Sequence, residues 1–168
     1  MIIRRETASD FDEIYNLVKI AFQTAKVSNG KEQDFVNELR GTQNYIPELA
    51  LVAQKNEILI GHIMLTRKMI TTNNSDFEML YLAPVSVVLE HRNKGVGSKL
   101  INESFKIAKQ LGYNSVILVG DPAYYSRFGF ATSKNFGITS AQNIPAEYVL
   151  ACELIPNTLK GIEGTVSF

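Results

Sequence analysis

Residues 85–112 read V-S-V-V-L-E-H-R-N-K-G-V-G-S-K-L-I-N-E-S-F-K-I-A-K-Q-L-G. An apolar run ends in a polar turn, Gly95 and Gly97 follow, and a helical pattern begins at once. The first N–H groups of a helix have no partner inside the helix, and the helix dipole adds positive potential there. Phosphate oxygens accept hydrogen bonds from these N–H groups, and their negative charge is favoured by the positive potential. This stretch therefore predicts a phosphate-binding loop.

The spacing of this loop, Arg92-x-x-Gly95-x-Gly97, differs from the common glycine-rich phosphate loops. It is not the G-x-G-x-x-G of dinucleotide-binding folds, and it lacks the Gly-Lys-Ser/Thr ending of the Walker loop. Two glycines alone are equally typical of an ordinary turn. The apolar strand before them and the amphipathic helix after them favour the phosphate loop.

Composition restricts the class of protein. The chain has 168 residues, which suits a single domain over residues 1–168, and 45% of them are hydrophobic. Its 17 basic and 17 acidic side chains give a net charge of zero, which argues against a nucleic-acid-binding protein. Cys152 is the only cysteine, so neither a disulfide within the chain nor a multi-cysteine metal site is expected. No apolar run approaches the roughly 20 residues that cross a membrane, and no signal peptide is recognisable. We therefore expect a soluble cytoplasmic protein.

Hydrophobic periodicity predicts the order of elements. Spacings of i, i+3 and i+4 indicate helices, and apolar runs between turn residues indicate strands. Helices are expected at residues 11–22, around residues 35–39 with an end at Gly41, from the two glycines to Gly112, and, as a helix or turn, at residues 122–128. Strands are expected at residues 2–5, 49–54, 58–70, 77–89, 115–120, 130–134, 146–154 and 165–168.

Two features refine this order. The strands at residues 77–89 and 115–120 flank the glycine-led helix, and such a strand-helix-strand unit predicts that they run parallel. Pro84 lies inside the first of these strands, and because proline has no backbone donor we expect an interruption near it, either a bulge or a place where a neighbouring strand diverges. The result is an α/β protein with a mixed sheet and helices on both faces.

The sequence resembles the GNAT superfamily of N-acetyltransferases over nearly the whole chain, and within it the bacterial YhbS-like group. The resemblance is carried by Arg92-x-x-Gly95-x-Gly97, by G-D-P-A-Y-Y-S-R-F-G-F at residues 120–130, and by the ending at residues 164–168. It implies a mostly antiparallel sheet whose central parallel strand pair splays to admit acetyl-CoA as co-substrate. Many members have an Asn before the Tyr-bearing helix, where this chain has Gly-Asp-Pro. The contact of that Asn with the pantetheine therefore does not carry over to this chain.

The resemblance also implies a site. Pantetheine amides would pair with the strand edge at Val85 and Val87, as an added strand does. The pyrophosphate would lie on the loop, which consists of Arg92, Asn93, Lys94, Gly95, Val96, Gly97 and Ser98. A backbone N–H would stabilise the oxyanion while an amine attacks the thioester directly. Tyr125 would then protonate the departing thiolate, because a phenol remains protonated at neutral pH.

Several assignments stay open in the sequence. Tyr124 competes with Tyr125 as the acid, and both could be packing aromatics. The general base is not identified: the candidates are Glu48, Glu78, Glu90, His62 and His91, and each is equally readable as an ordinary surface or packing residue. Two histidines do not make a metal site, and none is expected. Cys152 lies in an apolar strand and is expected to be buried rather than nucleophilic.

The sequence therefore predicts an acetyl-CoA-dependent N-acetyltransferase that acts on a primary amine through a ternary complex. The alternatives are a non-catalytic acyl-CoA-binding or regulatory domain, and transfer to oxygen or of another acyl chain. The acceptor, a small molecule or a peptide amine, is not readable from the segments expected to select it, residues 25–44 and 134–146. No nucleic acid or membrane partner is expected, and a homodimer is compatible with the sequence.

Overall fold

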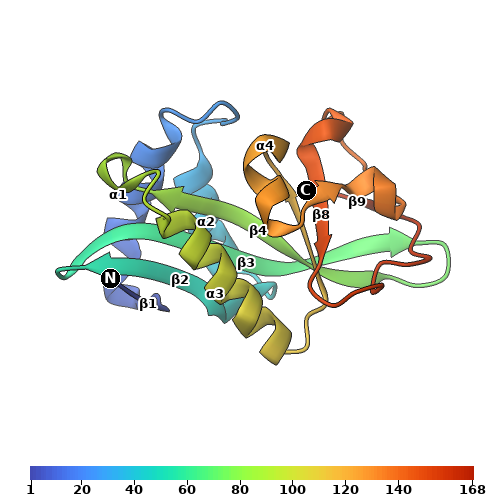
Figure 1. Cartoon of the computed structure of the whole chain (residues 1–168), viewed down its shortest axis with the longest axis horizontal. Coiled ribbons are helices and arrows are strands. Elements are labelled where there is room, and N and C mark those ends of the chain that lie inside the picture. The colour runs from blue at the N-terminus through green and yellow to red at the C-terminus, as the bar shows by residue number, and fades with distance from the viewer. The chain divides into compact units, whose positions relative to one another are not determined.

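The computed structural model describes all residues, 1–168 (Figure 1). Its four α-helices are α1 (Phe11–Phe22), α2 (Glu32–Arg40), α3 (Val96–Gln110) and α4 (Pro122–Tyr125). Its strands are β1 (Ile2–Arg5), β2 (Tyr45–Lys55), β3 (Ile58–Thr72), β4 (Phe77–Val87), β5 (Ser115–Val119), β6 (Ala131–Thr132), β7 (Ile138–Ser140), β8 (Val149–Glu153) and β9 (Gly164–Val166). Short 3-10 helices cover Ala8–Asp10, Leu89–His91, Ser126–Phe128, Ser133–Phe136 and Ala146–Tyr148.

The strands form a mixed, mostly antiparallel sheet. Hydrogen-bonded neighbours follow the order β1-β2-β3-β4-β5-β8-β6, and β9 pairs with β3 and β7. The predicted parallel pair is confirmed: β4 and β5 run parallel, with Leu80 opposite Val116 and Tyr81 opposite Ile117. By their internal contacts the residues group into two compact units, residues 1–66 with 83–108, and residues 67–82 with 109–168.

The first unit has helices on both faces of its strands. One face of β2 and β3 packs against α1, where Val52 and Met64 share a buried cluster with Ile14 and Leu17. The other face lies against α3, because a Cβ on Gly61 of β3 would meet side-chain atoms of Val96 and Leu100 at 3.1 and 2.9 Å. Glycine at position 61 is what lets the helix approach this closely.

The second unit has a separate apolar core. Its buried members come from β3, β4, β5, the strands after them and the turn before β9: Ile70, Met79, Ile117, Ile138, Val149, Ala151, Leu159 and Val166. Cys152 is buried in β8, as expected, and burial raises the pKa of its thiol to about 12. The thiol is therefore protonated at neutral pH and is not a nucleophile in this state.

Several predicted boundaries were wrong. The strand expected at residues 77–89 ends at Val87, and it continues through a cis Ala83–Pro84 peptide. Its pairing with β5 covers Leu80 and Tyr81 and stops before Pro84, which agrees with the expected divergence of a neighbouring strand. The strand expected at 130–134 has only two residues, and the one expected at 146–154 begins at Val149 after a turn of 3-10 helix. β7 was not predicted.

Candidate functional site

The predicted phosphate loop joins β4 to α3. Asn93 and Gly95 both have positive φ, at 58° and 79°, so the chain turns sharply just before the helix. The first bond of the helix ladder runs from Lys99 N to Gly95 O at 3.0 Å. The N–H groups of Val96, Gly97 and Ser98 therefore lie ahead of the ladder, as the first N–H groups of any helix do.

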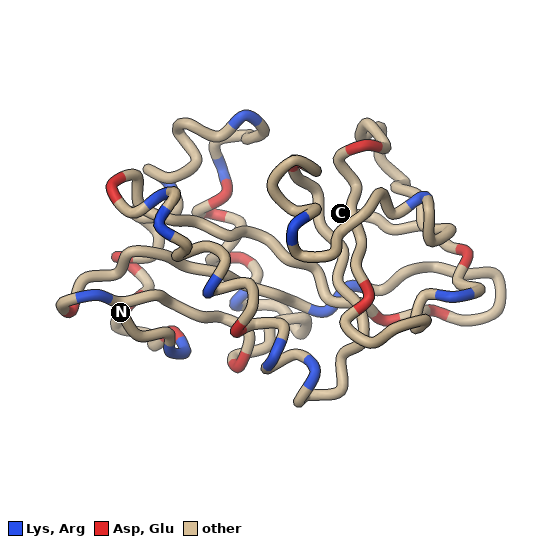
Figure 2. Tube along the Cα trace, viewed as in Figure 1, with Lys and Arg blue, Asp and Glu red and all other residues tan.

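Two basic side chains lie next to the start of this helix in the sequence. Lys94 and Lys99 flank the two glycines, and Lys94 Nζ donates to the Glu90 carbonyl at 2.8 Å. Val96 and Gly97 are buried, whereas Asn93, Lys94 and Gly95 are exposed and Ser98 is half-buried. Over the chain as a whole, both signs of charge are interspersed (Figure 2). Backbone donors without a partner inside the helix and local positive charge together suit an anion such as a phosphate.

Arg92 uses its side chain within the protein. Its Nε donates to the Val87 carbonyl at 3.2 Å, Nη1 donates to Thr24 Oγ1 at 2.7 Å, and Nη2 donates to the Ala21 carbonyl at 2.6 Å. Ala21 lies in the last turn of α1, where a cation also complements the helix dipole. The guanidinium thus ties the loop to β4 and α1, a role that the sequence did not reveal.

The end of β4 offers backbone groups at one edge. Val88 N donates to Ile60 O at 3.0 Å, so residues 86 and 88 direct their backbone groups toward β3. By alternation, Val85 and Val87 direct theirs toward the opposite edge, with the Val87 carbonyl accepting the Arg92 bond already described. This orientation suits the strand-like pairing predicted at Val85 and Val87, which stays a prediction.

Tyr125, the predicted acid, ends α4 in the second unit. Asp121 caps this helix by accepting from Ala123 N at 2.9 Å, with Pro122 at the first helical position. The Tyr125 ring packs edge-on against the rings of Tyr124 and Phe130, at 4.9 and 5.8 Å between centroids. Burial, with smaller contributions from Tyr124 and Tyr81, raises the pKa of Tyr125 well above its ordinary value of 10. The hydroxyl therefore keeps its proton through the neutral range.

Gly120 gives the Tyr125 ring its place. A Cβ at position 120 would lie 2.6 Å from Tyr125 Cε2, which is closer than a Cβ atom comes to a non-bonded carbon in proteins. We predict that Gly120→Ala displaces the ring and lowers turnover by roughly tenfold or more, since misplacing a catalytic group by about 1 Å can cost 10²-fold. Steady-state kinetics with circular dichroism would measure this. Full turnover in a folded Gly120→Ala protein would show that the position of Tyr125 is unimportant.

The candidate bases differ in their surroundings. Glu78 and Glu90 are exposed, Glu48 lies 3.9 Å from Arg5 in a half-exposed ion pair, and His91 is half-buried. His62 is fully buried on β3. No group of three or more histidine, cysteine or acidic side chains forms a cluster that could hold a metal ion.

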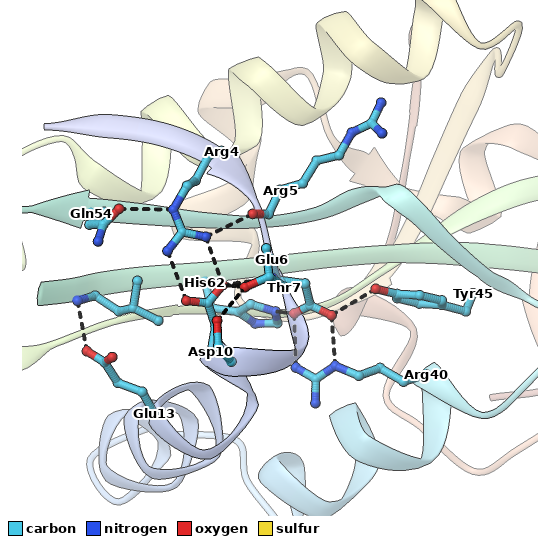
Figure 3. A network of polar contacts seen from close by, with 12 residues as sticks. Arg4, Arg5, Glu6, Thr7, Asp10, Glu13, Arg40, Tyr45, Gln54 and His62 are labelled. Carbon is cyan, nitrogen blue, oxygen red and sulfur yellow. Dashed lines mark hydrogen bonds and ion pairs between the residues drawn. The ribbon is translucent and has the colours of Figure 1, made fainter. Parts of the chain in front are cut away.

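His62 belongs to a buried polar network that the sequence did not reveal (Figure 3). Its Nε2 lies 2.9 Å from Glu6 Oε2. Arg40 Nε and Nη2 donate to the two oxygens of the same carboxylate at 2.7 and 2.9 Å, and the Tyr45 hydroxyl donates to Oε1 at 2.9 Å. Arg40 also lines an open hollow of about 530 Å³ beside α1 and α2, together with Phe11, Asp12, Tyr15 and Asn37.

Several known proteins are similar to this chain in sequence and in fold. A model of the acetyltransferase (GNAT) domain matches residues 2–133. The uncharacterized N-acetyltransferase YjhQ of Escherichia coli (strain K12) is 29% identical over 95% of this chain and 87% of its own length. The uncharacterized N-acetyltransferase YhbS of the same strain is 27% identical over 100% of this chain and 96% of its own length.

Two solved structures are similar over 99% of this chain. The GNAT family N-acetyltransferase YhbS from Escherichia coli, in complex with CoA, superposes with a TM-score of 0.85 at 26% identity and is covered over 88% of its length. A GNAT family acetyltransferase from Brucella melitensis, in complex with acetyl-CoA, has a TM-score of 0.78 at 28% identity and 94% coverage. None of the helices of the present chain is long and apolar enough to cross a bilayer.

Proposed function

This chain belongs to the acetyltransferase (GNAT) family of N-acetyltransferases, and we propose that it moves the acetyl group of acetyl-CoA to a primary amine by direct attack in a ternary complex. Residues 1–168 would act as one catalytic domain. The observation that carries the proposal is the loop from Arg92 to Ser98, whose donors stand ahead of the α3 ladder. The two similar structures that hold CoA and acetyl-CoA support the proposal that the anion bound by this loop is the pyrophosphate of acetyl-CoA.

Each part of the cofactor has a proposed partner. The pyrophosphate accepts hydrogen bonds from the N–H groups of Val96, Gly97 and Ser98, and Lys94 adds positive charge. The pantetheine arm pairs with the β4 edge at Val85 and Val87. No metal takes part in this scheme.

The proposed chemistry uses these partners together with Tyr125. The amine nitrogen attacks the thioester carbon, and a β4 backbone N–H holds the oxyanion. The intermediate collapses with loss of the CoA thiolate, which takes a proton from the Tyr125 hydroxyl. Because the pKa of Tyr125 is raised, this donor is fully protonated at pH 7.

The test combines binding with turnover. Calorimetry with acetyl-CoA and CoA measures cofactor binding, and a thiol-release assay with a panel of primary amines measures transfer. Amine-dependent thiol release, with the N-acetyl product identified by mass spectrometry, is expected. Tight cofactor binding without amine-dependent release from any panel member would favour the non-catalytic alternative, and release driven only by alcohols would favour transfer to oxygen.

The role of Arg92 gives a second prediction. We expect Arg92→Ala to weaken acetyl-CoA binding less than a charge placed at Gly97, because the loop N–H groups remain. The loss of three hydrogen bonds should lower the free energy of unfolding by roughly 1–3 kcal/mol. Calorimetry and denaturant unfolding would measure the two effects. Abolished binding in Arg92→Ala, with unchanged stability, would mean that the guanidinium contacts the phosphates rather than the protein.

A further inference from the structure

The buried carboxylate of Glu6 is ionised and hydrogen-bonded on both oxygens. Oε1 accepts from Arg40 Nε and the Tyr45 hydroxyl, and Oε2 accepts from Arg40 Nη2 and faces His62 Nε2 (Figure 3). Burial alone would raise the pKa of Glu6, but the bonds from Arg40 and His62 outweigh it and lower the pKa to about 2. An ionised carboxylate can only accept, so Nε2 of His62 carries the hydrogen.

The tautomer of His62 leaves its other nitrogen without a partner. Burial lowers the pKa of His62 below its ordinary 6.5, against the opposing effect of Glu6, so the ring is neutral at pH 7. With the hydrogen on Nε2, the Nδ1 lone pair is a free acceptor. Nδ1 is buried and has no hydrogen-bond partner. A buried polar atom without a hydrogen-bond partner is unusual, since more than nine in ten such atoms have one.

A second unpaired group lies on the neighbouring strand. Ser86 is only 3% exposed, and its Oγ also has no hydrogen-bond partner. Val88 N donates to Ile60 O, which makes Ile60 and Val88 direct neighbours across β3 and β4. Two residues further along each strand, His62 stands opposite Ser86. Opposite residues share one face of the sheet, with Cβ atoms about 4.5–5.5 Å apart.

The contacts of Gly61 support this register and face. A Cβ on Gly61 would lie 3.2 Å from the Ser86 carbonyl oxygen and would point toward Val96 and Leu100 of α3. His62, the next residue, points to the other face, where Glu6 and Arg40 meet it. The Ser86 side chain shares that face. The register therefore places two groups, a hydroxyl that can donate and a nitrogen that can accept, on one face of neighbouring strands. No hydrogen bond joins them in this structure, and catalytic hydrogen bonds often close only when substrate binds.

We propose that Ser86 and His62 form the proton-accepting pair of acetyl transfer, with Glu6 as the residue that positions the imidazole. This proposal rests on the proposed function, because Ser86 lies between Val85 and Val87, where the pantetheine arm and its thioester would bind. The charged groups that act on His62 are Glu6 after β1 and Arg40 of α2, and Tyr45 of β2 donates to the same Glu6 carboxylate.

Proton transfer accompanies the attack of the amine on the thioester. While the amine nitrogen bonds to the acetyl carbon, one of its N–H bonds breaks and the proton passes to Ser86 Oγ, whose own proton passes to His62 Nδ1. The imidazolium is held against the Glu6 carboxylate. The C–S electron pair leaves with the thiolate, which is protonated by Tyr125. After the amide leaves, the proton on His62 returns through Ser86 to water, and water restores the proton on Tyr125, so that amine and acetyl-CoA give amide and CoA.

The test uses His62→Gln, because a glutamine amide nitrogen can replace Nε2 as the donor to Glu6 but offers nothing in place of Nδ1. Thiol release from acetyl-CoA is measured with a fixed pool of spermidine, tyramine, kanamycin and a lysyl peptide. Turnover should fall by about 10²-fold or more, with acetyl-CoA affinity unchanged. The wild-type rate should fall as acid protonates His62, at a pH below 6.5, and this acid limb should vanish in the variant.

Ser86→Ala should lower turnover in the same way. The matched control is Ser115→Ala, which removes another buried hydroxyl without a partner, on β5, and should keep full turnover. Full turnover with an intact acid limb in folded His62→Gln or Ser86→Ala would overturn the proposal. If the wild type binds acetyl-CoA but releases no thiol with any of these amines, the transferase function itself fails, and the proton-accepting role fails with it.

A spectroscopic readout tests the pairing without an acceptor. The chain has only two histidines, so ¹⁵N-histidine spectra contain two rings. His62 should show the Nε2–H tautomer, and Ser86→Ala should shift its Nδ1 resonance while leaving the tautomer unchanged. A hydrogen on Nδ1, or an Nδ1 resonance that ignores the loss of the hydroxyl, would overturn the pairing.

Discussion

Replacing Tyr125 with phenylalanine is expected to lower turnover by roughly 10²–10⁴-fold, the usual contribution of a positioned general acid. Phenylalanine keeps the ring that packs against Gly120, Tyr124 and Phe130, so the fold and the acetyl-CoA affinity should change little. The only loss is the hydroxyl proton that the departing thiolate requires. Steady-state kinetics and calorimetry on the same preparation would separate chemistry from binding.

Tyr124→Phe is the matched control, because Tyr124 precedes Tyr125 in the same helix and packs against the same ring. It should retain most of the activity. Since the pKa of Tyr125 is raised above 10, no loss of rate from its ionisation is expected between pH 7 and 10. A fully active Tyr125→Phe enzyme, or an inactive Tyr124→Phe enzyme, would assign the acid to water or to Tyr124.

Placing an aspartate at Gly97 is expected to weaken acetyl-CoA binding by about 2–4 kcal/mol, the range for lost charge-assisted hydrogen bonds. This corresponds to roughly 30- to 1,000-fold in Kd. Gly97 is buried in the first turn of α3, beside the N–H groups proposed to bind the pyrophosphate, so an added side chain would crowd this part of the loop. Its negative charge would also repel the pyrophosphate.

Gly97→Asn separates these two causes, because it adds nearly the same volume without the charge. It should bind acetyl-CoA more tightly than Gly97→Asp and less tightly than the wild type. A carboxylate near a helix N-terminus does not destabilise the helix electrostatically. Circular dichroism should be used to confirm that both variants are folded before their affinities are compared. Unchanged affinity in folded Gly97→Asp would remove the phosphate-loop assignment.

Local sequence patterns predicted the parts of the fold that depend on local chemistry. The helix after Gly95 has its own start, apolar stripe and stop, with Gly112 at a φ of 89°. The parallel pairing of β4 and β5 followed from the strand-helix-strand order. β7 was missed because three residues carry no recognisable period, and this strand exists through its pairing with β9.

The buried network could not be predicted for a different reason. Along the chain, Arg40 lies 34 residues and His62 lies 56 residues from Glu6. Each is a single polar residue in an otherwise ordinary segment. Only the pairing of β2 with β1 and β3, and the packing of α2, bring them together. The anchoring of Arg92 to α1 is likewise a contact over 71 residues.

The most direct test of the central claim, that the loop between β4 and α3 binds the pyrophosphate of acetyl-CoA, is an acetyl-CoA titration followed by backbone amide NMR. The account predicts that the resonances of Val96, Gly97 and Ser98 are among those that move most, and that they saturate with the affinity measured by calorimetry. Saturating binding of acetyl-CoA that leaves these three resonances in place would contradict it.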